Sequence, residues 1–282
     1  MIYKIGKNLI FFIGEAMQYK LIGGFVLAIT CLLAADTCWD INTIRAYVHN
    51  SDMQRRWAMA FIAPYLKELK GNERILDIGC GDGRITADIS RFIPKGTILG
   101  IDPSKSMLEW AKKQYSPLEY PNLFFQEGSF SSPSLLESFD LIFSNCALHC
   151  SLDQYTAFKS LARLLKPEGK LIISIPSMDN IEWKQARINI VPRVILTLEE
   201  YRELLEEVGL HPKRIEKVDT VDPFIDRQEL LEFLMGTLSP NGSEVKLQEL
   251  IIEYIRLRPE ALLPNSVIEM RLGRIEIEAV KK

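Results

Sequence analysis

A glycine-rich turn at residues 77–83, Asp-Ile-Gly-Cys-Gly-Asp-Gly, is the segment of this sequence best suited to binding a ligand. It follows a short apolar stretch and precedes a helical pattern. Glycines spaced two apart lack a Cβ, so the backbone can pass close beside a bound molecule. The dinucleotide fingerprint is G-x-G-x-x-G, whereas counting from Gly79 this chain has Arg84 in place of the third glycine. The turn therefore predicts a ligand at a strand end, and its spacing disfavours a nicotinamide dinucleotide.

Two aspartates accompany this turn. Asp77 lies within the apolar stretch, and a buried carboxylate needs hydrogen bonds or a cation, such as the ammonium group of a ligand. Asp102 ends the next strand pattern, where an acid can accept hydrogen bonds from both hydroxyls of a ribose. Each feature alone has an ordinary explanation, a tight turn or a helix cap. Together they point far more specifically to a ligand that carries a ribose and a cation.

The body of the chain, from about Trp39, alternates strand and helix patterns. Strands are predicted at 74–78, 97–101, 122–126, 139–144, 170–175, 214–218 and 274–280. Helices are predicted at 53–69, 85–92, 104–115, 155–165, 197–208, 226–238 and 243–257. Thr197 and Glu200 have the spacing of a capping box, and Ser104 can cap the third helix.

This alternation predicts βαβ units and a mainly parallel sheet whose near-continuous apolar strands are buried on both faces. Residues 274–280 alternate strictly between polar and apolar, which predicts a late antiparallel strand with one exposed face. The predicted fold class is α/β: a doubly wound, mostly parallel seven-stranded sheet with that late antiparallel strand. A helical cover is predicted at about 178–272, within one domain that spans 36–282.

The composition is that of a folded protein. The chain has 282 residues, of which 47% are hydrophobic and 25% charged, and its formal net charge is −3. Disordered and disulfide-scaffold classes are therefore excluded. A strongly basic footprint is absent, which makes a nucleic-acid partner an unfavoured interpretation.

The cysteines and histidines do not form a recognisable metal motif. Cys146, His149 and Cys150 lie close together, but the five cysteines contain no CxxC pair and the chain has only three histidines. A zinc site needs about four nitrogen or sulfur ligands. We therefore expect no metal, and we expect reduced thiols.

The first 35 residues differ from the rest of the chain. Three lysines precede or flank an apolar run of fifteen residues, Leu21–Ala35, which is shorter than the roughly 20 residues of a spanning helix. Three interpretations stay open: an export signal, a membrane anchor acting through residues 9–35, or an upstream start or apolar helix packed on the domain. The catalytic domain itself is expected in the cytoplasm, because the cofactor inferred below is made there. The N-terminal apolar segment could attach it to a membrane.

Four motifs together resemble class I S-adenosylmethionine-dependent methyltransferases. They are D-I-G-C-G-D-G-R-I-T, G-I-D-P-S-K-S-M-L, F-D-L-I-F-S-N-C-A-L-H and L-L-K-P-E-G-K-L, and they occur in the order of that family. The match covers about residues 39–280. The resemblance implies a Rossmann-like fold, S-adenosyl-L-methionine as cofactor and methyl transfer as the activity.

Residue by residue, the resemblance places the glycine turn and Asp77 beside the amino-acid part of the cofactor and Asp102 at its ribose. Ser129 departs from the family pattern, which often has an aspartate near the adenine amine at this position. The residues implied to contact the cofactor are Asp77, Gly79, Cys80, Gly81, Gly83, Asp102, Pro103, Met107, Gly128, Ser129, Asn145, Gln54 and Tyr47.

Two further segments, 47–54 and 144–149, narrow the resemblance to carboxyl O-methyltransferases of small acids. This group includes the trans-aconitate, juvenile hormone acid and malonyl-carrier methyltransferases. By this resemblance Tyr47 and Gln54 belong to a lid over the cofactor, and Asn145 lies where the methyl group is transferred. His149 either donates a hydrogen bond to the acceptor or packs at a helix start. Cys150 stands where the group usually has a tryptophan.

A carboxylate acceptor needs no general base, because it is already ionised at pH 7. Alignment and exclusion of water then supply the catalysis, and a cation should hold the acid. Arg187 and Arg193 are the first candidates because both follow the fifth strand, and Arg271 and Arg274 are further ones. The alternatives are methylation of another small molecule, lipid or quinone at O, N or C, and a non-catalytic S-adenosylmethionine-binding protein.

Overall fold

The computed structural model describes residues 2–5, 8–11, 44–45, 47–48, 51–130, 135, 138–177, 195–237 and 244–282. Near the N-terminus, strands β1 (Ile2–Ile5) and β2 (Asn8–Phe11) form an antiparallel pair separate from the main sheet. Most of the predicted apolar N-terminal segment lies outside the described residues. Within the described ranges, no helix combines the length and apolar character needed to span a bilayer.

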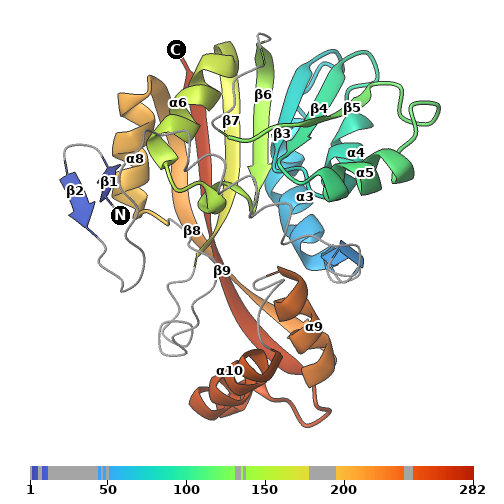
Figure 1. Ribbon diagram of the computed structural model, residues 1–282, viewed down its shortest axis with the longest axis vertical. Helices are drawn as coiled ribbons and strands as arrows, with labels where there is room; N and C mark the ends of the chain where they lie inside the picture. The colour runs from blue at the N-terminus through green and yellow to red at the C-terminus, as the bar shows by residue number, and fades with distance from the viewer. Residues whose placement is uncertain are drawn as a thin grey trace, which may run out of the picture.

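The main sheet has seven strands in the order β5-β4-β3-β6-β7-β9-β8 (Figure 1). Their bounds are β3 Arg74–Ile78, β4 Thr97–Asp102, β5 Leu123–Glu127, β6 Phe139–Asn145, β7 Leu165–Ser177, β8 Leu210–Phe224 and β9 Ile268–Lys281. All neighbours pair in parallel except that β9 runs antiparallel to both β7 and β8. The predicted fold class, including the late antiparallel strand, is confirmed.

Helices cover both faces of this sheet. They are α3 Asp52–Leu66, α4 Arg84–Ser90, α5 Lys105–Gln114, α6 Gln154–Leu164 and α8 Leu198–Glu207. One core cluster joins α3 and α4 to β3, β6 and β7, and the other joins α6 and α8 to the opposite face. Burial of these apolar faces stabilises the layers, and the sites of ligand binding in such sheets lie at the carboxyl ends of the strands.

The predicted helix caps are confirmed by hydrogen bonds. The Ser104 hydroxyl accepts from the Met107 amide at the start of α5. At the start of α8, Thr197 accepts from the Glu200 amide while the Glu200 carboxylate accepts from the Thr197 amide. These reciprocal bonds satisfy amides that have no partner within the helix, so the local sequence alone fixes where both helices begin.

The last two strands are much longer than predicted, and the one-face-exposed interpretation of residues 274–280 is wrong. β9 pairs with β8 along fourteen residues and also lies against β7, so it is an interior strand. Its polar residues Arg274 and Glu276 are buried as an ion pair. Alternation of polar and apolar residues normally marks an exposed face, but here charge pairing compensates for burial of the polar face.

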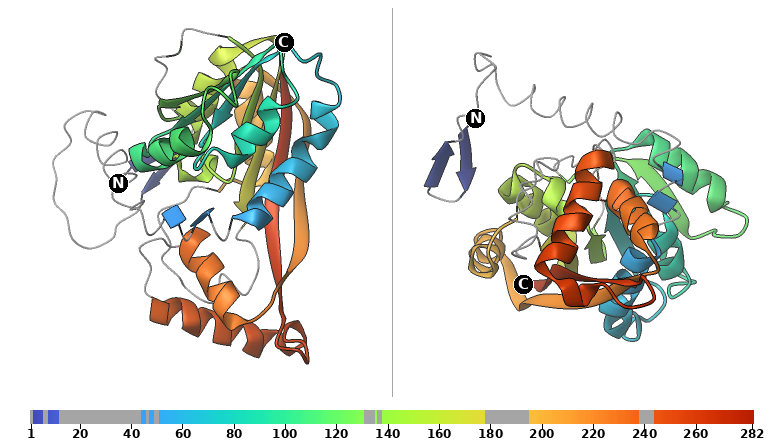
Figure 2. Two further views of the ribbon diagram at one scale, coloured as in Figure 1. Left: turned by 90° about the vertical axis from the view of Figure 1, so that its right-hand side faces the viewer. Right: turned by 90° about the horizontal axis from the view of Figure 1, so that it is seen from below.

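Beyond the main sheet, β8 and β9 continue as a two-stranded ribbon that carries helices α9 (Arg227–Thr237) and α10 (Glu244–Leu257) (Figures 1 and 2). The helix pair, with the short helix η2 (Pro259–Ala261), has its own apolar core, which includes Met53 from the first turn of α3. The described part of the predicted cover at about 178–272 thus comprises this lobe together with α8 and β8, which belong to the main layers. The lobe lies at the carboxyl ends of the parallel strands.

Candidate functional site

The glycine turn lies at the carboxyl end of β3, and its three glycines adopt the left-handed backbone conformation. Gly79, Gly81 and Gly83 have φ angles of 75°, 53° and 77°. Residues with a Cβ rarely adopt this left-handed region, so glycine is required on conformational grounds alone. The Gly79 and Cys80 amides both donate to the Ile101 carbonyl at 2.8 and 3.1 Å, which ties the turn to the end of β4.

The three glycines face different surroundings. A Cβ added at Gly79 would lie 2.2 Å from the Cβ of Ala147, and one at Gly83 would lie 2.6 Å from the Phe125 ring. At Gly81 the nearest atom is the Tyr47 hydroxyl at 3.8 Å. Two of the glycines are therefore needed for packing against the protein itself, and Gly81 is the one that faces Tyr47.

Asp102 joins the two loops at the carboxyl ends of β3 and β4. Its Oδ2 accepts from the Gly81 amide and its Oδ1 accepts from the Ser104 amide, both at 2.9 Å. Withdrawal from water raises the pKa of Asp102 to about 6. Each carboxylate oxygen keeps a further lone pair, so this fixed carboxylate can accept from the hydroxyl groups of a ribose.

Asp77 and Asp82 are buried on either side of the glycine turn, at 3% and 7% exposure. Thr86 Oγ1 donates to Asp77 Oδ2 at 2.6 Å, and burial raises the pKa of Asp77 to about 7. Burial also raises the pKa of Asp82, whose Oδ1 accepts from the Arg84 amide at 3.1 Å. Sequence reasoning missed Asp82, although its position inside the turn was visible.

Arg84 is a second residue whose role the sequence did not reveal. Its guanidinium donates to the Val48 carbonyl at 2.7 Å and to Asp52 at 2.5 Å, and it lies 3.6 Å from Asp82. Arg84 therefore fastens the chain before α3 to the glycine turn. Tyr47 belongs to the same segment. Burial, with the nearby charges of Asp82, Cys146 and Asp102, raises the pKa of Tyr47 well above its ordinary value.

The carboxyl end of β6 brings Asn145 and His149 to the same region. Ser144 Oγ donates to the Ile78 carbonyl at 2.8 Å and the Cys146 amide donates to the Ser174 carbonyl at 2.8 Å, which fixes this end of β6 between β3 and β7. Cys146 has a φ of 53°, a strained value for a residue with a Cβ. His149 is 3% exposed within the short helix η1 (Leu148–Cys150).

The predicted adenine-side residues lie at the ends of β4 and β5. The Gly128 amide donates to the Asp102 carbonyl at 3.1 Å, Met107 is buried at 2% exposure, and Pro103 and Ser129 are half-buried. The structure thus brings the described candidates together along one edge of the sheet. Arg187 and Arg193, the predicted substrate cations, lie outside the described residues.

The donor and acceptor inventory of this edge fits S-adenosylmethionine. That molecule carries an ammonium group, a sulfonium and ribose hydroxyls, and the edge offers three carboxylates, Asp77, Asp82 and Asp102. Two further acceptors, Gln54 Oε1 and Asn145 Oδ1, are buried and have no hydrogen-bond partner among the described residues. Buried acceptors without partners are costly unless a ligand supplies donors, so the residues present suit a cationic nucleoside.

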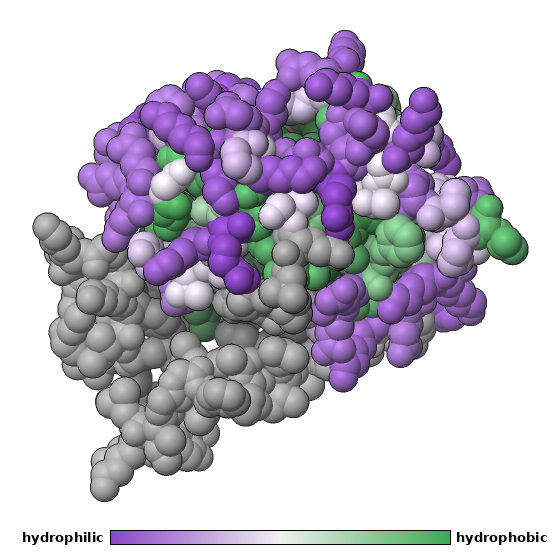
Figure 3. Space-filling model, turned by 90° about the horizontal axis from the view of Figure 1, so that it is seen from above, coloured by the Kyte–Doolittle hydropathy of each residue, from purple (hydrophilic) through white to green (hydrophobic). Residues whose placement is uncertain are grey.

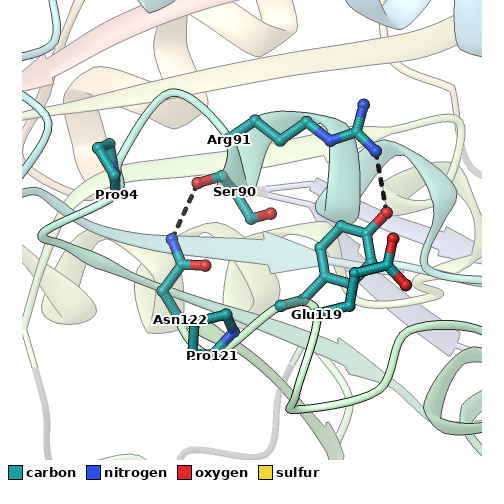
Figure 4. A pocket seen from close by; sticks show the side chains of 7 residues that line it. Ser90, Arg91, Pro94, Glu119, Pro121 and Asn122 are labelled. Atoms are coloured by element: carbon teal, nitrogen blue, oxygen red, sulfur yellow. Dashed lines mark hydrogen bonds between the residues drawn. The ribbon is translucent and has the colours of Figure 1, made fainter.

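The opposite end of the molecule has a different character. Figure 3 shows that the described residues at this end are largely hydrophilic, with apolar areas between them. A surface pocket there is lined by Ser90, Arg91, Pro94, Glu119, Tyr120, Pro121 and Asn122 (Figure 4). Asn122 Nδ2 donates to the carbonyls of Ser90 and Ile93, and Arg91 donates to the Tyr120 hydroxyl. These bonds end α4 and connect it to the loop before β5, so a structural role accounts for them.

The chain is similar in sequence to known methyltransferases. A family model described as a methyltransferase domain matches residues 69–209. The 235L protein of Invertebrate iridescent virus 6 is 25% identical over 242 residues, which are 79% of this chain and 88% of that protein. Trans-aconitate 2-methyltransferase of Escherichia coli K12 is 28% identical over 172 residues, 58% of this chain and 66% of the enzyme.

A solved structure shows the same fold. Geranyl diphosphate methyltransferase in complex with S-adenosylmethionine superposes with a TM-score of 0.55 at 14% identity, covering 82% of this chain and 85% of that one. At this identity the similarity concerns the fold alone.

Proposed function

This chain belongs to the methyltransferase domain family, and we propose that it methylates a carboxylate oxygen of a small organic acid. It is an S-adenosylmethionine-dependent methyltransferase with a Rossmann-like fold. The finer assignment, to a carboxyl O-methyltransferase, is supported by the similarity to trans-aconitate 2-methyltransferase and by the residues at the carboxyl end of β6.

The observation that carries the proposal is the kind of side chain found where β6 ends. Asn145 ends the strand with a carboxamide, whose –NH2 group can donate to a carboxylate, and Cys146, Ala147 and Leu148 follow it. The side chains of Asn145, Ala147 and Leu148 cannot take a proton from a neutral hydroxyl or a carbon acid, and we expect them to align an acceptor. A carboxylate requires no such base because it is ionised at neutral pH.

S-adenosylmethionine, when bound, supplies an electrophilic methyl group on a sulfonium. Asp102 would hold its ribose through oxygens already oriented by the Gly81 and Ser104 amides. Asp77 and Asp82 would attract its positive charges, and Gln54 would accept from its amino-acid part. Such groups are positioned before the ligand binds, which reduces the entropy cost of alignment.

At the acceptor side, Asn145 and His149 would orient the carboxylate, and Tyr47 with the segment that Arg84 holds would exclude water. Exclusion of water favours this reaction because a carboxylate and a sulfonium neutralise one another as the methyl group moves. The residues of this chain therefore act by binding, orientation and desolvation. The test is methyl transfer from methyl-labelled S-adenosylmethionine, by the full chain, to a panel of carboxylic acids.

Each labelled product is then treated with mild base. Label released by base identifies a methyl ester and supports the proposal. Base-stable label, or transfer only to amines, quinones or a lipid extract, contradicts it and identifies the enzyme as another type of small-molecule methyltransferase. A chain that binds S-adenosylmethionine but transfers to none of these acceptors would instead favour a non-catalytic binding protein.

A further inference from the structure

A row of polar side chains crosses three strands on the sheet face covered by α3. Asn145 of β6 is in register with Ser174 of β7, and Ser174 is in register with Glu276 of β9. Arg274 lies two residues from Glu276 and is in register with Pro176. Residues in register, and those two apart, project from the same face of a sheet. The row therefore leads from the end of β6, where we place methyl transfer, to Arg274.

Arg274 is the buried end of a series of ion-paired side chains whose charges alternate in sign. Its Nε donates to Glu276 Oε1 at 2.8 Å, and the two side chains are 8% and 6% exposed. The second oxygen of Glu276 accepts from Arg214 at 3.3 Å, and Arg214 also donates to Glu216, which is 46% exposed. Glu216, at the negative end of this series, is thus hydrated, whereas Arg274, at the positive end, is not.

The row also contains polar atoms that lack partners. Arg274 Nη1 and Ser174 Oγ are buried and make no hydrogen bond within the described part of the chain, as is true of Asn145 Oδ1. An unsatisfied buried donor on a guanidinium is expensive, and most buried polar groups in folded proteins are paired. Their occurrence along one row, beside the methyl-transfer end of β6, indicates a surface built for a polar ligand.

The Arg274 guanidinium is also held by α3. Its Cζ lies 5.3 Å from the centroid of the Trp57 ring, one turn of helix after Gln54. A cation–π contact of this kind restrains a guanidinium through its face, so its N–H groups remain available to a planar partner. A carboxylate is the planar anion that an arginine edge binds best.

We propose that Arg274 binds a carboxylate of the methyl acceptor, and that this is the carboxylate that does not receive the methyl group. The inference rests on the proposed function. Two strand spacings and two residues separate Asn145 from Arg274, or about 12 Å between their Cα atoms. An acceptor with a second carboxylate can span this distance, so the favoured acceptors are di- or tricarboxylic acids.

Arg274 is better suited to bind the acceptor carboxylate than Arg271, the other candidate cation among the described residues. Arg271, on the same strand, is exposed to water, where an ion pair contributes little. Arg274 is 7% exposed, and at a desolvated site a guanidinium nitrogen that lacks a hydrogen-bond partner, as Nη1 does, discriminates strongly between an acid and its neutral amide. The structure thus assigns acceptor specificity to a residue on the final strand, far in sequence from the glycine turn.

The test is calorimetric binding of succinate, glutarate, citrate and trans-aconitate to the full chain saturated with S-adenosylhomocysteine, with glutaramate as the neutral-ended comparison for glutarate. We expect Arg274→Gln to weaken binding of the preferred acid at least tenfold and to abolish its preference over the monoamide. Arg274→Lys, which keeps the charge beside Glu276, should have an intermediate effect. Arg271→Gln is the matched control and should leave acid binding unchanged.

Affinity for S-adenosylhomocysteine should change less than twofold in both Arg274 variants, which shows that the site is still folded. The inference is overturned if no acid binds to the wild type, or if Arg274→Gln binds the preferred acid as tightly as the wild type. The labelled-methyl assay separates this result from the proposed function. Base-stable label together with Arg274-dependent acid binding would contradict only the proposed function, whereas methyl ester formation indifferent to Arg274 would contradict only the inference.

Discussion

The Gly81 amide donates a 2.9 Å hydrogen bond to Asp102 Oδ2, which links the loops at the carboxyl ends of two neighbouring strands. The other oxygen of Asp102 is fixed in the same way by Ser104. One carboxylate thereby sets the separation between the glycine turn and the start of α5. Asp102 thus has a structural role, and because both of its oxygens are already oriented we expect it to bind ligand hydroxyl groups as well.

Replacing Asp102 with alanine should abolish measurable S-adenosylmethionine binding by calorimetry while unfolding stays cooperative. Loss of charge-assisted hydrogen bonds to two hydroxyls costs about 3 kcal/mol or more, roughly 100-fold in affinity. Asp140→Ala is the control, because Asp140 accepts from the Arg74 amide and pairs with Lys166 at the amino ends of the strands. Wild-type affinity in Asp102→Ala would remove Asp102 from the cofactor site.

Gly79→Ala should destabilise the fold even without cofactor, because the new Cβ would meet Ala147 at 2.2 Å. Gly209→Ala is a closely matched control: Gly209 has a φ of 82°, similar to the 75° of Gly79, but nothing lies within 4 Å of its added Cβ. Both variants pay for the left-handed backbone, about 1–2 kcal/mol, and Gly79→Ala should lose about 1–3 kcal/mol more through overpacking. Urea denaturation of the apo proteins measures the difference, and equal losses would contradict the packing role of Gly79.

The sequence predicted the order of strands and helices well because each element carries its own local signal. Thr197 and Ser104 cap their helices through hydrogen bonds to residues three positions away, and the spacing of the glycines indicates a turn with a left-handed backbone. The lengths of β8 and β9 could not be predicted, since they depend on partners distant in the chain. For the same reason, burial of Arg274 was missed: the residues that compensate for it, Glu276 and Trp57, are identified only by the fold.

The residues of the candidate site likewise include some that local motifs predict and some that only the fold identifies. Asp77, Asp102 and the three glycines lie in consecutive motifs, and the structure brings them to one edge of the sheet. Arg84 was noticed in the sequence only as a departure from a dinucleotide motif. Its contacts with Val48 and Asp52 join segments more than thirty residues apart, which no local pattern indicates.

The contribution of Asp77 and Asp102 to the stability of the apo protein should fall as pH rises from about 4 to 7. Burial raises the pKa of Asp77 to about 7 and that of Asp102 to about 6, from an ordinary aspartate pKa of 3.8. In this interval the native state holds protons that the unfolded chain has released, so the free energy of unfolding decreases as pH rises. Binding of the cationic cofactor should strengthen over the upper part of the same interval, because the deprotonated carboxylates attract it.

Asp77→Asn provides the check on that pH dependence. Its stability, measured by urea denaturation at several pH values, should decline less between pH 4 and 7 than that of the wild type. Thr86 can still hydrogen-bond to the amide at this position, since Thr86 Oγ1 now donates to Asp77 Oδ2. An unchanged pH slope in Asp77→Asn would show that the raised pKa of Asp77 does not contribute to the linkage.

Arg84→Met should loosen the segment that precedes α3 and weaken cofactor binding without abolishing it. The substitution removes the bonds to Val48 and Asp52 but keeps most of the apolar stem. We expect amide hydrogen exchange at residues 47–54 to accelerate and S-adenosylmethionine affinity to fall about tenfold, the equivalent of roughly 1.4 kcal/mol. Since Tyr47 lies 3.8 Å from the position of a Cβ at Gly81, loss of order in this segment exposes the turn to water.

Arg55→Met is the matched control for Arg84→Met. Arg55 of α3 pairs with Asp88 of α4 at 2.6 Å, so its removal also breaks an ion pair between the same two regions of the fold. That pair is solvent-exposed and lies outside the segment before α3, so cofactor affinity should stay within twofold of the wild type. Equal effects of the two substitutions would mean that Arg84 acts through general stability, and a selective effect of Arg84→Met assigns the segment that it holds to the cofactor site.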